Sequence, residues 1–243
     1  MKLLLIFILS FALNAHAAGF KVNVQGYNAD VDTGTEDVNS AAITLPTAVA
    51  ATTVVSADAA DDAAGTGART IKIEGLNSAF RTVSETIIMD GTTPVNATYQ
   101  YLRINSVKVL TVGSGAASAG AITVKHTATV IASLEAGEMV ARTAVYTAPL
   151  TPQNWIITKV YGSISNAAAG AVVFTLMTRT SGGLWLDRFQ FSVYGTGKCS
   201  DAIELGSPIA VTAGEDVKIT ATAGADNIAV FAGFDLKGSN APL

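Results

Sequence analysis

The sequence predicts an all-β protein of two consecutive β-sandwich or jelly-roll-like domains with mostly antiparallel strands. Two observations carry this prediction. Apolar and polar residues alternate with a period of two, which is typical of strands with one buried face. The alternating segments are short, and Gly, Pro, Asn and Asp residues separate them as turns would. No segment has a convincing helical period, so we expect a fold made of strands and turns.

The clearest strands lie in the first half of the chain. Ile71 and Ile73 alternate with charged residues, which predicts one buried and one exposed face. Residues 83–89 form a second expected strand, and the Asp-Gly pair at 90–91 directly after it is a strong hairpin signal. Residues 99–112 form a third, longer strand.

The second half repeats this pattern, with about eight short strands in about 105 residues, as in a sandwich or jelly roll. Residues 171–178 are almost continuously apolar, which is typical of a strand buried on both faces. With the strand at 184–193 they offer more apolar surface than one small sandwich needs, which favours a subunit contact. The candidate interface residues are Phe189, Phe191, Val193, Trp185 and Tyr194.

Turn signals around residues 135–138 divide the chain. We expect an N-terminal β domain over residues 68–137, to which the preceding segment adds strands. A C-terminal β-sandwich or jelly-roll domain follows over residues 138–243. Residues 18–67 are an acidic arm of low complexity, and residues 1–17 precede the fold.

Residues 1–17 have the pattern of a secretory signal peptide. Lys2 supplies a positive charge, residues 3–13 are an apolar run, and Ala15 and Ala17 place small residues where a signal peptidase cleaves. The run is too short to span a bilayer comfortably. The pattern predicts cleavage after Ala17 and export of the mature chain.

The acidic arm carries seven Asp and Glu residues and no base between Lys21 and Arg69. The Asp30-x-Asp32 pair raises the question of a calcium site, since hard cations bind several carboxylate oxygens. The pair lacks the Gly and the terminal Glu of the helix-loop-helix calcium motif, so a solvated acidic loop without metal is the favoured interpretation. We expect residues 30–62 to be mobile or ordered only by their neighbours.

The composition narrows the function classes. Apolar residues make up 49% of the chain, 41 residues are Ala, and only 14% are charged, which suits close-packed sheets and subunit contacts. A net charge of −4 argues against binding to nucleic-acid phosphates. Cys199 is the only cysteine, which excludes an intrachain disulfide and predicts a buried small hydrophobe.

The inventory of reactive side chains argues against an enzyme and against a cofactor or metal site. His126 is the only histidine after the signal-like segment, and it falls within a strand pattern, where a packed side chain is the common use. No Gly-x-Ser-x-Gly elbow occurs, and one Cys with one His cannot form a structural zinc site. Glu74 and Glu85 are the one carboxylate pair of glycosidase type, but both alternate with apolar residues and are expected to face solvent.

Four aromatic residues raise the hypothesis of a sugar-binding groove. Tyr99, Tyr101, Trp185 and Tyr194 would suit a sugar-binding groove if the fold brought them together. Core or interface contacts are the commoner use of such residues.

Four stretches carry a resemblance to a known family. They are residues 62–96, with the sequence DAAGTGARTIKIEGLNSAFRTVSETIIMDGTTPVN, then YLRINSVKVLTVGS, AVYTAPLTPQNWIIT and the final AVFAGFDL. In this order they resemble a family of virion β-sandwich proteins of tailed phages, of the head-decoration or tail type, common in marine phages. The likeness covers roughly residues 50–237 and includes no catalytic residue.

The resemblance implies a non-enzymatic virion structural protein that acts through protein–protein assembly. It implies self-association, as a homotrimer by analogy, contacts with other virion proteins, and location in the virion. The signal-like residues 1–17 depart from the family pattern, because virions assemble in the cytoplasm.

Two alternatives remain open. One is an exported bacterial surface or adhesin-like protein that binds carbohydrate or another cell, and host-surface carbohydrate is also a candidate partner of a virion protein. The other is a secreted carbohydrate-active enzyme, for which the sequence offers no convincing acid/base pair.

Overall fold

The structure is a computed structural model that describes residues 20–165, 170–195 and 199–240. The signal-peptide-like segment, residues 1–17, lies outside the described residues. Within the described ranges the chain forms sixteen strands and no helix, which confirms the all-β prediction. In this part of the chain, accordingly, no helix is long and apolar enough to cross a membrane.

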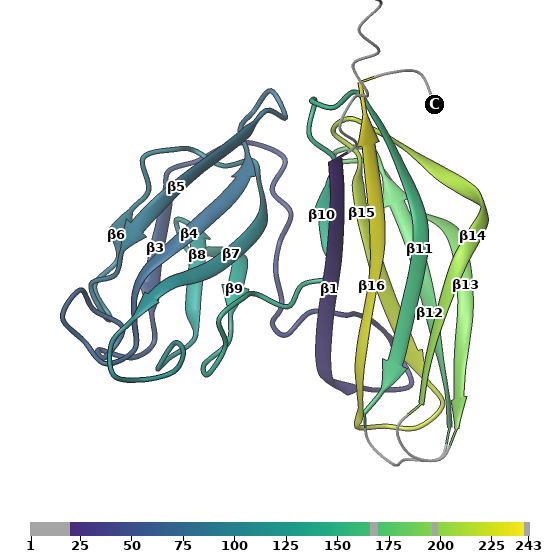
Figure 1. Cartoon of the computed structure of the whole chain (residues 1–243), viewed down its shortest axis with the longest axis horizontal. Helices are drawn as coiled ribbons and strands as arrows, with labels where there is room; N and C mark the ends of the chain where they lie inside the picture. The colour runs from purple at the N-terminus through teal and green to yellow at the C-terminus, as the bar shows by residue number, and fades with distance from the viewer. Residues whose placement is uncertain (1–19, 166–169, 196–198, 241–243) are drawn as a thin grey trace, which may run out of the picture.

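The N-terminal domain is a sandwich of two antiparallel sheets around its own hydrophobic core (Figure 1). The sheet orders are β6-β3-β8-β9 and β5-β4-β7. The strands are β3 (Thr52–Ser56), β4 (Ala68–Leu76), β5 (Thr82–Ile88), β6 (Val95–Asn96), β7 (Arg103–Val112), β8 (Ile122–His126) and β9 (Thr129–Leu134).

Alternation along these strands produces the core as the sequence predicts. Ile71 and Ile73 of β4 are fully buried, and Val107 and Val109 of β7 join the same core. After β5 the chain turns at Gly91, whose φ of 55° lies in the left-handed region that favours glycine. The Asp-Gly pair therefore follows the end of a strand, but the hairpin that it predicts is wrong, because β5 and the next strand, β6, belong to different sheets.

The C-terminal domain is a larger sandwich with a second, separate core (Figure 1). Its sheets have the orders β1-β16-β11-β14 and β10-β15-β12-β13, and β2 also pairs with β15. The strands are β1 (Phe20–Val31), β2 (Thr35–Asp37), β10 (Val145–Thr147), β11 (Asn154–Ile164), β12 (Gly170–Arg179), β13 (Leu186–Gly195), β14 (Cys199–Thr212), β15 (Asp216–Ala223) and β16 (Ile228–Ser239).

The first strands of the acidic arm belong to this C-terminal sandwich, which differs from the expectation that arm strands join the N-terminal domain. β1 pairs antiparallel with β16 from Phe20 onward, and Val24 and Val31 enter the second core. Among the described strands of the arm, only β3 joins the N-terminal domain. The N-terminal domain is therefore an insertion between β2 and β10.

The last part of the acidic arm is fixed by one buried carboxylate. Asp61 is fully buried and accepts hydrogen bonds from the Ser56 hydroxyl at 2.6 Å and from the backbone N–H groups of Ala68, Ala119 and Gly120 at 2.6–2.9 Å. Burial alone would raise the pKa of this carboxyl, but these hydrogen bonds hold the pKa below its ordinary value. Asp61 thus holds the start of β4 against the loop that precedes β8.

Candidate functional site

The structure divides the five predicted interface residues between core and surface. Phe191 and Val193 of β13 are buried in the C-terminal core, where Phe191 stacks on Phe174 with ring centroids 5.2 Å apart. Phe189 is half-buried against the same core. The outward alternates of β13 include Tyr194, which is 80% exposed.

Trp185 lies just before β13 and packs against two cations. The Arg179 guanidinium lies 4.4 Å and the Lys218 ammonium 4.6 Å from its ring centroid. Such contacts stabilise the ring by about 0.5–2 kcal/mol each, depending on desolvation. The leucines on either side of it, Leu184 and Leu186, are 86% and 57% exposed.

These exposed residues belong to the edge of the C-terminal sandwich, which we call the β13–β14 flank and define as Leu184, β13 and β14. Because β13 bulges between Asp187 and Phe189, Leu186 lies opposite the buried Thr178 and Tyr194 lies opposite the outward Ala171, so these two side chains point to opposite faces of the sheet. β13 ends one sheet of the C-terminal sandwich and β14 ends the other, so their outer edges have no partner strand among the described residues. The two strands contact each other on the side away from the N-terminal domain (Figure 1). The flank is the candidate assembly surface.

The edge of β14 is poorly suited to adding a further strand. Ile157 of β11 pairs with Ile209 of β14, and Lys159, two residues further along β11, pairs with Glu204. Residues 205–208 of β14 therefore bulge out of the pairing. Pro208 lies in this bulge and has no N–H to donate. Bulges and prolines protect edges against indiscriminate strand pairing, so a partner at this flank would contact side chains instead.

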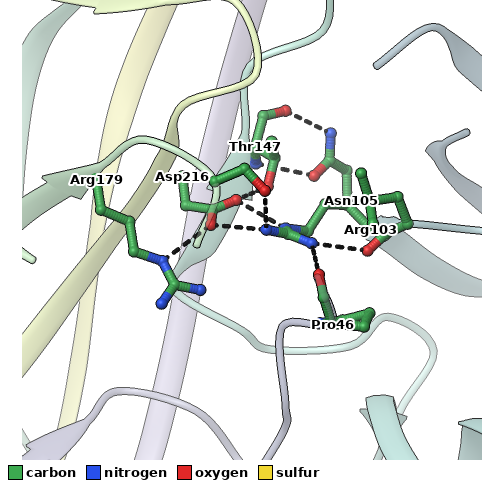
Figure 2. A network of polar contacts seen from close by, with 8 residues as sticks. Pro46, Arg103, Asn105, Thr147, Arg179 and Asp216 are labelled. Atoms are coloured by element: carbon green, nitrogen blue, oxygen red, sulfur yellow. Dashed lines mark hydrogen bonds and ion pairs between the residues drawn. The ribbon is translucent and has the colours of Figure 1, made fainter. Parts of the chain in front are cut away.

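A buried polar cluster joins the two domains (Figure 2). Arg103 of β7 and Asp216 of β15 form a bidentate ion pair, with Nε–Oδ1 at 2.8 Å and Nη2–Oδ2 at 2.9 Å. Their side chains are 1% and 0% exposed. All five N–H groups of Arg103 have acceptors, because it also donates to the carbonyls of Pro46 and Leu102 and to the Ser181 hydroxyl.

Asp216 accepts two further bonds, from the Thr147 hydroxyl at 2.6 Å and from Arg179 Nε at 3.0 Å. Burial would raise the pKa of the Asp216 carboxyl, but Arg103, Thr147 and Arg179 together hold the pKa below its ordinary value. The carboxylate therefore stays ionised at neutral pH and keeps both arginines paired.

Neighbouring hydrogen bonds extend this joint. The Asn105 amide donates to the Thr147 carbonyl at 2.9 Å and accepts from the Thr147 N–H at 3.0 Å. Leu150 N–H donates to the Phe80 carbonyl at 2.8 Å, so the turn after β4 is also tied to the C-terminal domain. The cluster thus gives the joint between the domains a specific polar geometry.

The expectation that Glu74 and Glu85 both face solvent is wrong for Glu85. In the β4–β5 ladder Glu74 lies opposite Ser84, and Glu85 lies opposite the buried Ile73, so the two carboxylates point to opposite faces of the sheet. Glu85 accepts bonds from the Tyr101 hydroxyl and from two backbone N–H groups. The predicted pair is therefore separated, and Glu85 has a structural role at the sheet edge.

The four aromatic residues proposed for a sugar groove are not brought together. Tyr101 is buried and Tyr99 is partly exposed in the N-terminal domain, whereas Trp185 and Tyr194 belong to the C-terminal domain. Among the described residues no group of three or more His, Cys, Asp or Glu side chains is placed to hold a metal ion. Cys199 is a half-buried free thiol packed against the C-terminal core.

His126 is buried at the end of β8. Burial lowers the pKa of its imidazole, and a hydrogen bond to the Tyr101 backbone opposes that shift. Its Nε2 has no hydrogen-bond partner among the described residues. The side chain is therefore a neutral core residue that resists protonation.

Comparison with known proteins adds little to this geometry. No protein family matches the chain, and no curated protein matches it in sequence. The chain is similar to the protein in the crystal structure of the infectious bursal disease virus VP2 subviral particle, with 12% identity over 91% of this chain and 70% of that chain. The TM-score is 0.21, which is too low for this likeness to carry an argument.

We predict that Arg103→Met weakens the joint between the domains. The substitution leaves Asp216 buried with one arginine lost, and breaking a buried pair in this way destabilises by about 3–5 kcal/mol. Chemical unfolding followed by tryptophan fluorescence and calorimetry should show a lower midpoint and separate transitions for the two domains. Arg81→Met, at an exposed position of the N-terminal domain outside the β13–β14 flank, is the matched control and should leave the midpoint unchanged. One unshifted transition in Arg103→Met would show that the pair is dispensable.

We predict that acid destabilises the N-terminal domain through His126. The unfolded chain binds the proton with a pKa of about 6.5, whereas the folded chain resists it, so stability falls as the pH drops below that value. The slope is at most about 1.4 kcal/mol per pH unit, the value for uptake of one whole proton. Urea unfolding between pH 7.5 and 5 should reveal this slope in the wild type and a smaller one in His126→Gln. Equal slopes in both proteins would contradict the assignment.

Proposed function

We propose that this chain is a non-enzymatic structural protein of a virion, a capsid decoration or tail component that acts by assembling with itself and with other virion proteins. The observation that carries the proposal is the β13–β14 flank, which offers exposed Leu184, Leu186 and Tyr194 at the free edge of a sandwich. Large side chains exposed at such an edge are suited to contacts with a neighbouring subunit.

The buried polar cluster around Arg103 and Asp216 also supports this proposal, because it fixes the relative orientation of the two domains. An assembly unit has to present its contact surfaces at fixed angles, and the Arg103–Asp216 pair fixes one domain against the other. The bidentate geometry restrains orientation as well as distance. A two-domain unit of this kind is suited to a building role in which neither domain moves.

The sequence resemblance provides the virion setting and the homotrimer. A trimer would use a heterologous contact, in which the flank of one copy meets a different surface of the next. Acidic composition and the −4 net charge agree with protein partners and not with nucleic acid.

The alternative function is an exported bacterial surface or adhesin-like protein that binds carbohydrate or another cell. The observation that favours it is the signal-peptide pattern that ends at Ala17. In that case the mature chain is secreted or held at the cell surface.

We predict that the purified protein forms a homotrimer at micromolar concentration, with three times the 24.8 kDa mass of the chain. Leu186→Lys combined with Tyr194→Lys should reduce the species to a monomer, because two cations at an apolar contact prevent burial. Light scattering and native mass spectrometry measure both states.

The matched control carries the same two changes on the other domain, Leu110→Lys with Tyr99→Lys, at positions that are 45% and 43% exposed. The control should remain trimeric. A monomeric wild type would overturn the assembly proposal, and a trimer that survives the Leu186/Tyr194 change would show that the flank is not its interface.

We predict that the protein is a component of purified phage particles and retains the segment before Ala18. Intact-mass measurement of the chain from particles should give a mass that begins at Met1 or Lys2. A chain that begins at Ala18 and is found in culture supernatant, absent from particles, would establish the exported alternative instead.

A further inference from the structure

Two polar hollows meet on the outer face of the sheet β1-β16-β11-β14, the four strands seen side by side in Figure 1. The first, which we call the interdomain cleft, has a volume of about 690 Å³ and lies between β1 and the N-terminal domain. The second, which we call the β11 hollow, has a volume of about 570 Å³ and crosses from β1 to β14. Asn23 of β1 lines both, so the hollows adjoin at this residue.

Tyr161 forms a flat aromatic platform in the β11 hollow. Its backbone on β11 pairs with Gly233 of β16, yet its hydroxyl donates to the Val24 carbonyl of β1 at 2.9 Å. The side chain therefore spans β16 and lies along the sheet. A Cβ on Gly233 would collide with the phenol, so the glycine makes the room beneath the ring. One ring face covers Gly233, and the other faces the hollow.

Polar side chains surround this ring in a fixed arrangement. The Asn23 amide donates to the Tyr161 hydroxyl at 3.0 Å and to Asp235 at 2.5 Å, and Gln25 donates to Asn23 at 2.7 Å. Lys159 is paired with Glu204 at 3.2 Å on the far side of the ring. Ser163 and Ser200 lie opposite each other across β11 and β14. These groups form a rim of donors and acceptors around an apolar ring face.

The interdomain cleft continues this pattern. Its charged side chains are Lys21, Glu74, Glu138 and Arg142, two of each sign. Arg142 pairs with Glu138 at 3.0 Å, but the other carboxylate oxygen of Glu138 is buried and has no hydrogen-bond partner among the described residues. A hydroxyl group in the cleft would supply the missing donor.

We propose that these two adjoining hollows act as one groove that binds a neutral oligosaccharide chain, with one sugar ring stacked on Tyr161 and the chain running past Asn23 across β1 into the interdomain cleft. A sugar ring has an apolar face of C–H groups, which suits the negative face of an aromatic ring, and a rim of hydroxyls that both donate and accept. The groove has a matching arrangement, with the face of the Tyr161 ring at its floor and hydrogen-bond donors and acceptors around that ring.

The charges and the shape select this ligand class over others. The two hollows are lined by positive and negative side chains in nearly equal number. They therefore produce no net positive potential that would attract phosphate chains or strongly acidic polymers. Amide and hydroxyl groups surround Tyr161 in the β11 hollow, whereas the exposed Met139 and Val140 lie in the interdomain cleft, so the β11 hollow differs from the apolar centre of a protein interface. Two linked hollows fit a chain of several sugars better than a single small molecule.

The test is ligand-observed NMR on the full chain with a panel of neutral hexasaccharides: maltohexaose, cellohexaose, mannohexaose and chitohexaose. At least one should show saturation transfer at millimolar concentration. Tyr161→Ala should weaken that binding roughly tenfold or more, because it removes the stacking platform. The matched control is Tyr99→Ala, a tyrosine of the N-terminal domain that is 43% exposed and lines neither hollow, and it should bind as the wild type does.

A second variant separates loss of the groove from loss of folding. Ala202 is exposed on β14 and lines the β11 hollow, so Ala202→Arg fills the hollow without touching the Tyr161 hydrogen bonds. It should abolish binding while the melting temperature stays that of the wild type. Binding of hyaluronan or oligogalacturonate in place of every neutral chain would overturn the neutral-ligand claim.

Failure of the whole neutral panel with folded wild-type protein would overturn the proposal. So would binding that survives both Tyr161→Ala and Ala202→Arg. The inference does not depend on the virion assignment, since assembly at the β13–β14 flank is measured by mass and sugar binding by NMR.

Discussion

The Arg103–Asp216 ion pair is the interaction on which the relation between the two domains depends. Each sandwich has its own core, so neither needs the other to bury its apolar strand faces. The joint is instead polar, and a buried ion pair by itself adds little net stability because desolvation offsets the attraction. Its contribution is specificity: five donors of one guanidinium and four bonds to one carboxylate are satisfied in a single relative orientation.

The insertion topology explains why such a joint is useful. The chain completes β1 and β2 in the C-terminal sandwich, builds the N-terminal domain, and returns at β10. Two connections therefore cross between the domains, and Pro46, in the outgoing one, accepts a bond from Arg103. The returning connection leads into Thr147, which bonds both Asp216 and Asn105. The same cluster thus fixes the two crossings and the two sheets they connect.

Much of the fold could be predicted from the sequence because strand alternation is a local signal. Ile71 and Ile73, and Phe191 and Val193, face the cores that their period implies. The same alternation does not distinguish a core from an interface, which is why Phe191 was a candidate for both. The Arg103–Asp216 pair joins residues 113 positions apart, and its only sequence signal is a cation inside a strand. The pairing of β1 with β16 is equally non-local, because the sequence does not show which edge a strand completes.

The two proposed surfaces share one strand, and this constrains how they could operate together. β14 is the outer edge of its sheet at the flank, and its residues Ser200, Asp201 and Ala202 also line the β11 hollow. A subunit that contacts the flank therefore lies beside one end of the groove. The other end, in the interdomain cleft, lies across the sheet at β1 and is shaped by Glu74 and Asn105 of the N-terminal domain. Its shape depends on the angle that the Arg103–Asp216 pair fixes, so the joint between the domains is also a determinant of the groove.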